Sequence, residues 1–505
     1  MKNLPETAQN STDGQIQKKR SNVAGKAGLM VMSRAVTITV QMLSLMALTR
    51  ILTKEDFGLL TFVLLAYATV TTLSQVGLPD SIFYYFERVP PESRKTLAYL
   101  TSKTLLKIGL GTSILFVVLT FVAPLWGHPV DGLFIPLIFL ALLELPTIPV
   151  PNVLIAIDRA KDAAWFNIVA SVLQLATLIV PALMGQPLLI ILLSYLGYGV
   201  VRFLLSVYLF FKNFKGQSGE LPAGMAREQL LYSLPLGLAQ MLWGLNRQID
   251  KYIIAAFFPI AIFAEYSIGA WEIPLIPSIA YAVASVMMPQ FVANHIKNDR
   301  EGLLSLWFTS IQKVSIIVLP LTILFLISAE EFIAVCFSEK YLAAAVPFRI
   351  YTLILLQRVA AYSSMHRALG NTKVISYAAA YLLLINVGLS LPLVILMGVA
   401  GPPTATLLAN IFTWVYTLQK MRRTLAVSFK EVFPFRFYGK TLLTAVMAGI
   451  PVFILKMNVN YSYAVDLIWM ATLYLTLYAL LSKVAGVVKK EDWQFLARGL
   501  KLKAQ

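Results

Sequence analysis

The most informative residues are basic side chains that lie inside long apolar stretches of the chain. The five that we assign to one shared site are Arg34, Arg247, Lys251, Lys313 and Arg358. A charged side chain near the centre of a bilayer costs about 2.5–3.5 kcal/mol, so each of these groups must face protein or water. A guanidinium group gives phosphate oxygens two parallel hydrogen bonds, and a lysine adds a point charge. These residues therefore predict a cationic central cavity that suits a pyrophosphate group.

One apolar stretch, residues 229–257, carries a polar stripe. Gln240, Gly244, Arg247 and Lys251 recur every three or four residues, which places them on one face of a helix. Asp250 follows Arg247 by three residues, so the two side chains are close enough to pair. Two interpretations stay open. The stripe lines the cavity, or it forms a self-neutralising network that only holds neighbouring helices together.

Acidic residues inside the apolar stretches are fewer, and two of them have predicted basic partners. Arg34 and Asp80 lie six or seven residues from the same end of two successive helices. At about 1.5 Å per residue they share a depth, so we expect them to be in contact in at least one conformation. Glu144 and Arg358 both lie near mid-membrane, and we expect them to close the cavity when it is empty.

Two further carboxylates, Asp250 and Glu272, share a depth in the outer half of the membrane. Neighbouring carboxylates in a low dielectric cannot both stay charged without a proton or a cation. These two residues are therefore the candidates for ion or proton coupling.

The composition shows what must position these residues. Of 505 residues, 58% are hydrophobic and only 13% are charged, and the mean hydropathy is +0.73. A soluble protein could not bury that much apolar surface, so lipid must surround most of the chain. Apolar runs of about 20 residues predict spanning helices. We expect fourteen, near residues 27–50, 58–86, 97–125, 132–156, 163–183, 188–211, 229–257, 263–292, 303–327, 343–367, 373–397, 401–421, 439–457 and 463–485.

The distribution of Lys and Arg gives an independent check on the fourteen spans. With the N-terminus inside, the even-numbered loops and the two tails carry 29 basic residues, and the odd-numbered loops carry four. This asymmetry is typical of a membrane protein whose two termini are both cytoplasmic. It also explains the net charge of +17 without a nucleic-acid partner.

Polar breaks after the sixth and twelfth spans predict an all-α membrane protein with two pseudo-symmetric six-helix bundles and two extra C-terminal helices. Residues 158–162 and 368–373 occupy similar places in the two bundles, about 210 residues apart. Parallel repeats of this kind are typical of alternating-access transporters. The predicted parts are an N-terminal cytoplasmic tail (1–26), the first bundle (27–211), a cytoplasmic linker (212–228), the second bundle (229–421), an interfacial linker (422–438), the two extra helices (439–485) and an amphipathic cytoplasmic tail (486–505).

Several kinds of chemistry have no motif in this sequence. There is no phosphate-cradling Walker sequence, no HExxH, no CxxC pair and no GxSxG elbow. One cysteine, Cys336, and three histidines are too few for a disulfide or a metal cage. We therefore expect neither an enzyme nor a resident metal or cofactor.

Three segments carry a resemblance to a known family. Residues 49–58 (TRILTKEDFG) resemble the A-R-x-L-(G/S)-x-x-(D/E)-(F/Y)-G stretch of bacterial polysaccharide flippases. Residues 246–251 (NRQIDK), followed by Tyr266, are similar to the second-half counterpart of that stretch. Residues 367–373 (RALGNTK) are similar to the family's A-L-G-(N/K)-(T/P)-K turn. The family belongs to the multidrug/oligosaccharidyl-lipid/polysaccharide exporter superfamily.

The resemblance implies a flippase of the bacterial inner membrane. Such a protein moves undecaprenyl-pyrophosphate-linked oligosaccharide units, such as O-antigen units, from the cytoplasmic to the periplasmic leaflet by alternating access. It implies a monomer among membrane lipids that works with a polymerase and other polysaccharide assembly proteins. The alternative is a cation-coupled multidrug exporter of the same superfamily, which normally has twelve spans and an acidic cavity. A third reading, an intramembrane enzyme or polymerase subunit, would need longer outer loops.

Overall fold

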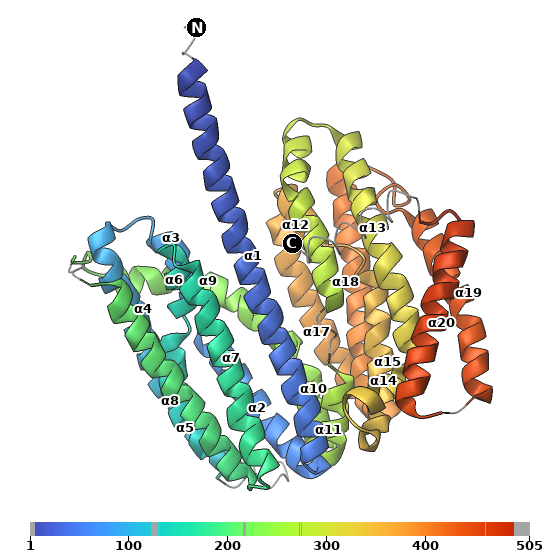
Figure 1. Ribbon diagram of the computed structural model, residues 1–505, viewed down its shortest axis with the longest axis horizontal. Helices are drawn as coiled ribbons and strands as arrows, with labels where there is room; N and C mark the ends of the chain where they lie inside the picture. The colour runs from blue at the N-terminus through green and yellow to red at the C-terminus, as the bar shows by residue number, and fades with distance from the viewer. Residues whose placement is uncertain are drawn as a thin grey trace. The chain divides into compact units, whose positions relative to one another are not determined.

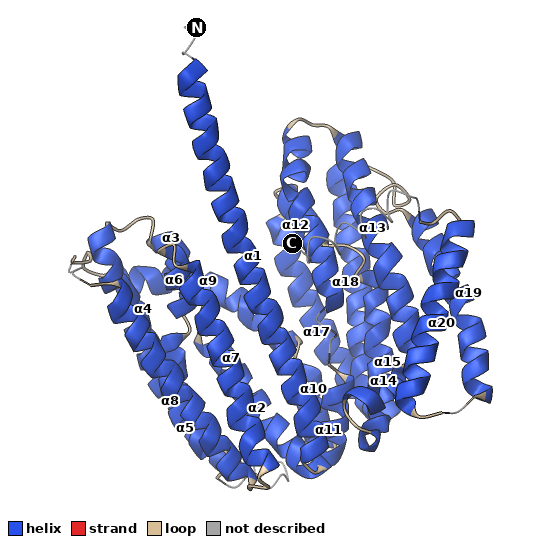
Figure 2. Cartoon of the chain, viewed as in Figure 1, coloured by secondary structure: helices blue, strands red, loops and turns tan. Residues whose placement is uncertain are grey.

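The computed structural model describes residues 6–122, 130, 132–215, 219–271, 273, 275–459 and 461–488. All regular structure in these ranges is helical (Figure 2), which confirms the predicted all-α class. Two expectations concern residues that the structure does not describe. Glu272 and nearly all of the amphipathic tail predicted at 486–505 lie outside the described residues.

Eleven helical segments of the described chain are long and apolar enough to cross a membrane. The protein is therefore a multi-pass membrane protein. One of the eleven, Thr372–Leu425, holds two helices separated by the short turn Gly398–Ala400. The expected spans seven and eight are not among the eleven, and each is broken into two helices.

The chain forms two compact units, the first ending at Gly244 and the second beginning at Leu245. In the first unit α1 packs against α7, and α5 packs against both α4 and α8 (Figure 1). The division falls inside the seventh expected span rather than at the linker 212–228. The helices of this unit are α1 (Glu6–Ile51), α2 (Lys54–Ser74), α3 (Leu78–Tyr85), α4 (Arg94–Val122), α5 (Ile135–Glu144), α6 (Val150–Ala156), α7 (Ala160–Leu183), α8 (Leu188–Asn213) and α9 (Met225–Asn246).

The second unit contains a hairpin of α17 and α18, and α13 packs against both α12 and α19. Its helices are α10 (Ile249–Phe257), α11 (Ile260–Gly269), α12 (Leu275–Ile296), α13 (Arg300–Ile327), α14 (Ala329–Cys336), α15 (Ala345–Ile354), α16 (Tyr362–Ala368), α17 (Thr372–Met397), α18 (Gly401–Leu425), α19 (Phe435–Asn458) and α20 (Tyr463–Val484).

Two of the recognised motifs form sharp turns between helices. Residues 49–58 include the turn from α1 to α2, where the Thr53 hydroxyl accepts a hydrogen bond from the Asp56 backbone amide at 3.1 Å. A side-chain cap of this kind satisfies an amide that the helix itself cannot pair. Residues 367–373 form the turn from α16 to α17, where Gly370 has a φ of +69°. Glycine adopts this left-handed conformation without steric cost.

The two units share an interruption in the middle of a span. In the first unit a 3-10 turn at Leu145–Thr147 follows α5, and prolines at 146, 149 and 151 explain the break. In the second unit a 3-10 turn at Leu355–Gln357 follows α15, 210 residues later. This second break contains no proline, so tertiary contacts must maintain it.

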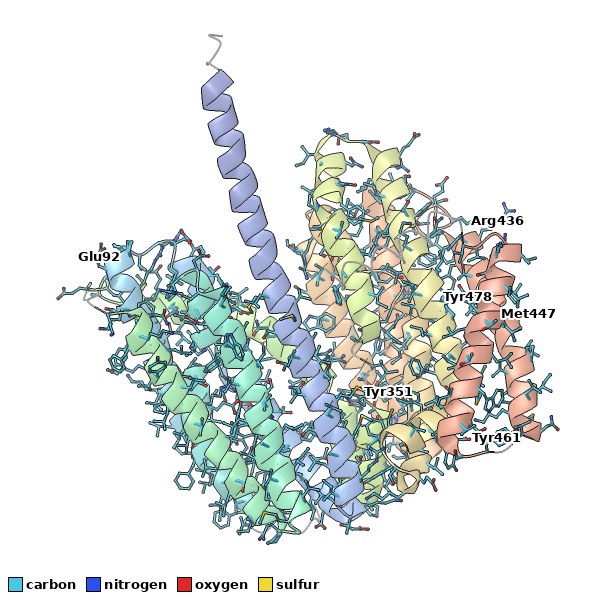
Figure 3. The ribbon with its side chains drawn as sticks, viewed as in Figure 1. Glu92, Tyr351, Arg436, Met447, Tyr461 and Tyr478 are labelled. Carbon is cyan, nitrogen blue, oxygen red and sulfur yellow. The ribbon has the colours of Figure 1, made fainter. Side chains whose placement is uncertain are left out.

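The two extra helices pack onto the second unit. Tyr474 of α20 is fully buried against α19, and the Tyr478 hydroxyl donates to the Ile316 carbonyl of α13 at 3.1 Å. Figure 3 places Arg436 and Tyr461 at opposite ends of the α19–α20 pair. A charged residue and an aromatic residue at the two ends are typical of a pair that crosses a bilayer.

A small ion-pair network surrounds two glutamates of α14, a helix that lies outside the candidate spans. The Arg349 guanidinium lies 2.8 Å from Glu330 Oε1, and Lys456 lies 2.8 Å from Glu331 and 3.5 Å from Glu330. Partial burial favours the neutral form of Glu330, but the Arg349 hydrogen bond and the Lys456 charge outweigh it and lower the pKa of this carboxyl. The network therefore ties α14 to both α15 and α19.

The Glu330 network gives a pH-dependent prediction. A lowered pKa stabilises the fold above the ordinary glutamate value of about 4.3, and the contribution disappears as the pH falls through the lowered value. Glu330→Gln is expected to cost less than about 1 kcal/mol at pH 7, because a half-exposed pair is screened by solvent. Thermal unfolding from pH 7 to pH 3 should show the variant and the native protein converging in acid. A gap that persisted at pH 3 would contradict this account.

Candidate functional site

A buried polar cluster surrounds Glu144 in the first unit. The Glu144 carboxylate accepts hydrogen bonds from Arg202 and from the Tyr67 hydroxyl, both at 2.5 Å, and from Tyr198 at 3.3 Å. The charged side chains are only 15% and 16% exposed. These groups come from α2, α5 and α8, so the cluster ties three helices together at the break that follows Glu144.

Arg202 is held on several sides. It donates to the Tyr198 hydroxyl at 2.6 Å, and its guanidinium lies 5.6 Å from the centre of the Phe166 ring. Aromatic faces of this kind stabilise a cation in a low dielectric. Sequence reasoning assigned Glu144 to Arg358 and gave Arg202 no role in the site. The sequence feature that could have identified this pair is that Glu144 and Arg202 carry opposite charges and both lie inside apolar spans.

Asp80 is exposed at the start of α3 and contacts two other helices. Its carboxylate accepts a hydrogen bond from Gln240 of α9 at 2.5 Å and one from Asn152 of α6 at 3.3 Å. Arg34 is exposed on α1. The expected contact between Arg34 and Asp80 stays a prediction for another conformation.

Helix α9 packs closely on α3 and α4. The buried Gln229 amide donates to Ser81 at 2.9 Å and to Thr101 at 2.8 Å, and the rings of Tyr84 and Tyr232 stack 4.4 Å apart. Gly237 meets the turn between α2 and α3, where Gly77 has a φ of +71°. These contacts explain why α9 belongs to the first unit although the sequence assigned it to the second bundle.

The close approach at Gly237 predicts a strong effect of one methyl group. A Cβ atom at this position would lie 2.7 Å from the Gly77 backbone nitrogen, so Gly237→Ala is expected to cost about 1–3 kcal/mol of stability. At Gly244, on the same helix, the nearest neighbour would be the Thr72 side chain at 3.5 Å. Gly244→Ala is therefore the matched control and should be neutral or stabilising. Thermal unfolding in detergent measures both, and equal melting temperatures would contradict the packing.

A second buried cluster surrounds Asp250 in the second unit. Asp250 is 4% exposed, and Tyr351 and Tyr266 both donate to its Oδ2 atom, Tyr266 at 2.9 Å. Figure 3 labels Tyr351. Its other oxygen, Oδ1, is buried and accepts no hydrogen bond from the described residues. The tyrosines come from α11 and α15, so this cluster also joins three helices.

Amide and hydroxyl oxygens lie on the helices that pack against α10. The Asn386 Oδ1 atom accepts hydrogen bonds from Ser390 at 3.0 Å and Thr406 at 3.2 Å, and the Asn386 amide donates to Asn246 at 3.4 Å. Asn386 and Ser390 lie on α17 and Thr406 on α18, and α10 packs against both helices. Carboxylate, amide and hydroxyl oxygens are suitable ligands for a hard cation.

The predicted helix over 229–257 is broken, which corrects the continuous polar stripe. Arg247 and Gln248 form a turn between α9 and α10, and Arg247 is exposed there. Lys251 follows in α10 and donates to the Gln248 side chain at 3.2 Å. A helical face cannot run unbroken through this turn, so Gln240 and Lys251 lie on separate helices.

The two remaining predicted cations lie on neighbouring elements of the second unit. Lys313 is half-buried on α13, and Arg358 is half-buried in the turn that follows Leu355–Gln357. Helix α13 packs against both α15 and this 3-10 turn. Arg358 therefore directly follows the interruption of its span in the second unit, whereas Glu144 directly precedes the corresponding interruption in the first.

A match to a family model shows the family to which this chain belongs. The model described as polysaccharide biosynthesis protein matches residues 23–295, more than half of the chain. The chain belongs to this family. The match confirms the resemblance drawn from the three motifs. A second model, described as lipid II flippase MurJ, matches residues 245–473 of this family member.

Solved structures share the fold at low sequence identity. Lipid II flippase MurJ in an inward closed conformation has a TM-score of 0.69 and 14% identity, and the alignment covers 91% of this chain and 98% of MurJ. An inward-facing multidrug resistance MATE family transporter of the MOP superfamily has a TM-score of 0.58 and 16% identity, covering 77% of this chain and 94% of the transporter. No curated protein sequence matches this chain. The fold of this polysaccharide biosynthesis protein is therefore that of the MOP superfamily.

Proposed function

We propose that this protein is a flippase for undecaprenyl-pyrophosphate-linked oligosaccharide repeat units, which it moves from the cytoplasmic to the periplasmic leaflet of the bacterial inner membrane by alternating access. The observation that carries the proposal is the family match over residues 23–295. The match to the lipid II flippase model over residues 245–473 supports a lipid-linked substrate.

The pyrophosphate group binds in a cationic central cavity. Its ligands are Arg34, Arg247, Lys251, Lys313 and Arg358. Three features support this role: all five lie in or beside apolar helices, Arg34 and Arg247 are exposed, and the other three are only half-buried. Charge-assisted hydrogen bonds to phosphate strengthen in a cavity with low-dielectric walls.

Asp250 couples transport to an ion or a proton. The buried Oδ1 atom without a described hydrogen bond and the amide and hydroxyl oxygens on α17 and α18 support this assignment. Glu272 remains its proposed partner. Glu144 and Asp80 act in gating, because each joins three helices next to a break in a span.

The proposed topology has fourteen spans and two cytoplasmic termini. The eleven candidate segments supply twelve spans, because Thr372–Leu425 holds two, and the broken pairs α9–α10 and α11–α12 supply the other two. The protein acts as a monomer among membrane lipids, with a polymerase and other polysaccharide assembly proteins as partners. It is not an enzyme and carries no cofactor.

A cation-coupled multidrug exporter is the second candidate, favoured by the MATE fold neighbour. The two functions need opposite cavity charges. Purified protein should bind a polyprenyl-pyrophosphate analogue and not a lipophilic cation. Arg34→Ala, Arg247→Ala and Arg358→Ala should each weaken binding by about tenfold, the effect of losing one charge-assisted contact.

Arg436→Ala is the matched control, because this arginine is exposed at the start of α19 and is not one of the five proposed ligands. It should bind the analogue like the native protein. If all three cavity variants kept full binding and full transport at normal expression, the cationic cavity would be wrong.

A further inference from the structure

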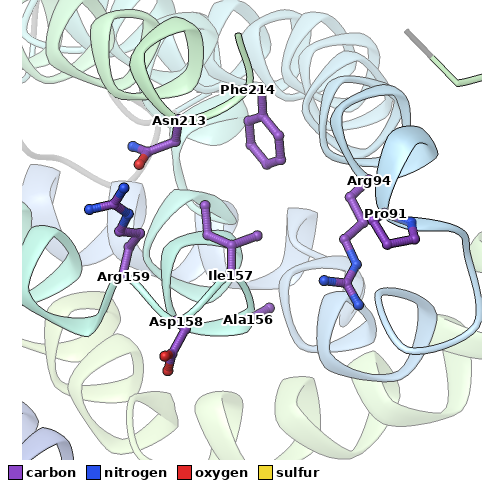
Figure 4. A pocket seen from close by; sticks show the side chains of 8 residues that line it. All are labelled: Pro91, Arg94, Ala156, Ile157, Asp158, Arg159, Asn213 and Phe214. Carbon is purple, nitrogen blue, oxygen red and sulfur yellow. The ribbon is translucent and has the colours of Figure 1, made fainter. Parts of the chain in front are cut away.

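A pocket lies where three connections of the first unit meet. It has a volume of about 350 Å³ and lies between the start of α4, the turn from α6 to α7 and the end of α8 (Figure 4). Ligand pockets in proteins usually measure about 300–1,000 Å³. This one is large enough for a small head group and too small for an oligosaccharide.

Two arginines line this pocket. Figure 4 shows Arg94 and Arg159 on opposite sides, with Ile157 and Phe214 between them. The Arg94 Nε atom donates to the Phe86 carbonyl at 3.0 Å, which orients its guanidinium group. Arg159 is exposed immediately before α7. The pocket thus combines two cationic walls with an apolar floor.

The charge in this pocket favours an anion. The lining carboxylate, Asp158, lies in a left-handed turn with a φ of +66°, and Figure 4 shows it pointing away from Ile157 and Phe214. The N-terminal ends of α4 and α7 add partial positive charge from their unpaired amides. A phosphate group satisfies two guanidinium groups at once, because it offers several acceptor oxygens.

The location favours a lipid as the source of that phosphate. The three connections are even-numbered loops, the set that carries the excess of Lys and Arg. Loops of this kind lie at the membrane surface, where basic pockets between helices bind anionic head groups. Ile157, which is partly exposed, supplies apolar surface that the glycerol end of a phospholipid would contact, whereas Phe214 is buried.

We propose that this pocket binds the phosphate group of an anionic phospholipid, separately from the transported substrate. Arg94 and Arg159 hold the phosphate from two sides. The acyl chains remain in the leaflet beside the helix ends. A lipid held in this way fixes the ends of α4, α7 and α8 relative to one another.

Lipid retention tests the pocket. Full-length protein is purified in detergent, mixed with phosphatidylglycerol or phosphatidylcholine, and examined by native mass spectrometry. The native protein should retain phosphatidylglycerol preferentially. Arg159→Gln should lower that retention about tenfold, the effect of losing one charged donor group. Lys161→Gln, which removes an exposed charge two residues away that does not line the pocket, is the matched control and should change little.

Arg94→Gln should lower phosphatidylglycerol retention to the same extent, but it also removes the hydrogen bond to Phe86. If Arg94→Gln fails to fold, Arg159→Gln alone decides the question. Unchanged phosphatidylglycerol retention in Arg159→Gln would overturn the proposal. Equal losses in Arg159→Gln and Lys161→Gln would indicate a diffuse surface field instead of a pocket and would also overturn it. Inorganic phosphate at the lipid concentration should not displace the lipid, and if it does, the ligand is a soluble phosphate and the lipid assignment is wrong.

Discussion

The Asp250→Asn variant is expected to lose most of its transport activity while remaining folded. Both tyrosine hydroxyls that contact Asp250 can still donate to an amide oxygen, so the hydrogen bonds that join α10, α11 and α15 are largely retained. The negative charge that holds a cation or a proton is lost. Coupling free energies of about 1–3 kcal/mol correspond to a 5–150-fold effect, and we expect a fall in transport rate within that range.

Asp466 offers a matched control for Asp250→Asn. Asp466 is also a buried carboxylate of the second unit, 6% exposed, but it lies on α20 and accepts hydrogen bonds from Trp469 at 2.8 Å and from the Tyr461 backbone amide at 3.2 Å. Asp466→Asn should keep near-native transport once corrected for expression. Transport by reconstituted protein measures both variants. Full activity of Asp250→Asn, or equal losses in the two variants, would remove Asp250 from the coupling role.

The second large effect concerns the pair of Glu144 and Arg202. Glu144→Gln or Arg202→Met alone leaves a charge in a site where the native side chains are about 15% exposed. Removing one partner of a buried ion pair costs about 3–5 kcal/mol, because the remaining charge is uncompensated. The double variant, which buries no net charge, should recover much of that stability.

A double-mutant cycle measures this coupling. Thermal unfolding of the four proteins is measured in the same detergent. The double variant should lose much less stability than the sum of the losses in the two single variants. The half-exposed pair of Glu330 and Arg349 serves as the comparison, since its coupling should stay below about 1 kcal/mol. Additive effects at Glu144 and Arg202 would mean that the two side chains do not form a single stabilising unit.

Hydropathy predicted most helices well but could not predict the breaks that contain no proline. The sixth expected span, 188–211, matches α8 (Leu188–Asn213) closely. The turn at Arg247–Gln248 and the turn at Leu355–Gln357 contain no proline or glycine, so nothing local marks them. Both depend on packing between segments that are distant in sequence, which a window of about 20 residues does not sample.

The candidate site shows the same limit. Counting residues from a span end gave the depth of Glu144, but depth does not reveal which helix lies beside it, and the structure places Arg202 there. Asp250 could be singled out as a candidate from its charge inside an apolar stretch. Its partners Tyr266 and Tyr351 could not, because tyrosine is common in apolar helices and only the fold brings these two together.

Leaflet transfer in reconstituted vesicles tests the central claim most directly. Vesicles containing the purified protein are loaded on one side with an undecaprenyl-pyrophosphate-linked saccharide, and a lectin added outside reports its arrival in the outer leaflet. We predict transfer that depends on the protein, that falls sharply in Arg247→Ala and that persists in Arg436→Ala. Vesicles that accumulate a lipophilic cation but leave the saccharide in its original leaflet would contradict the account.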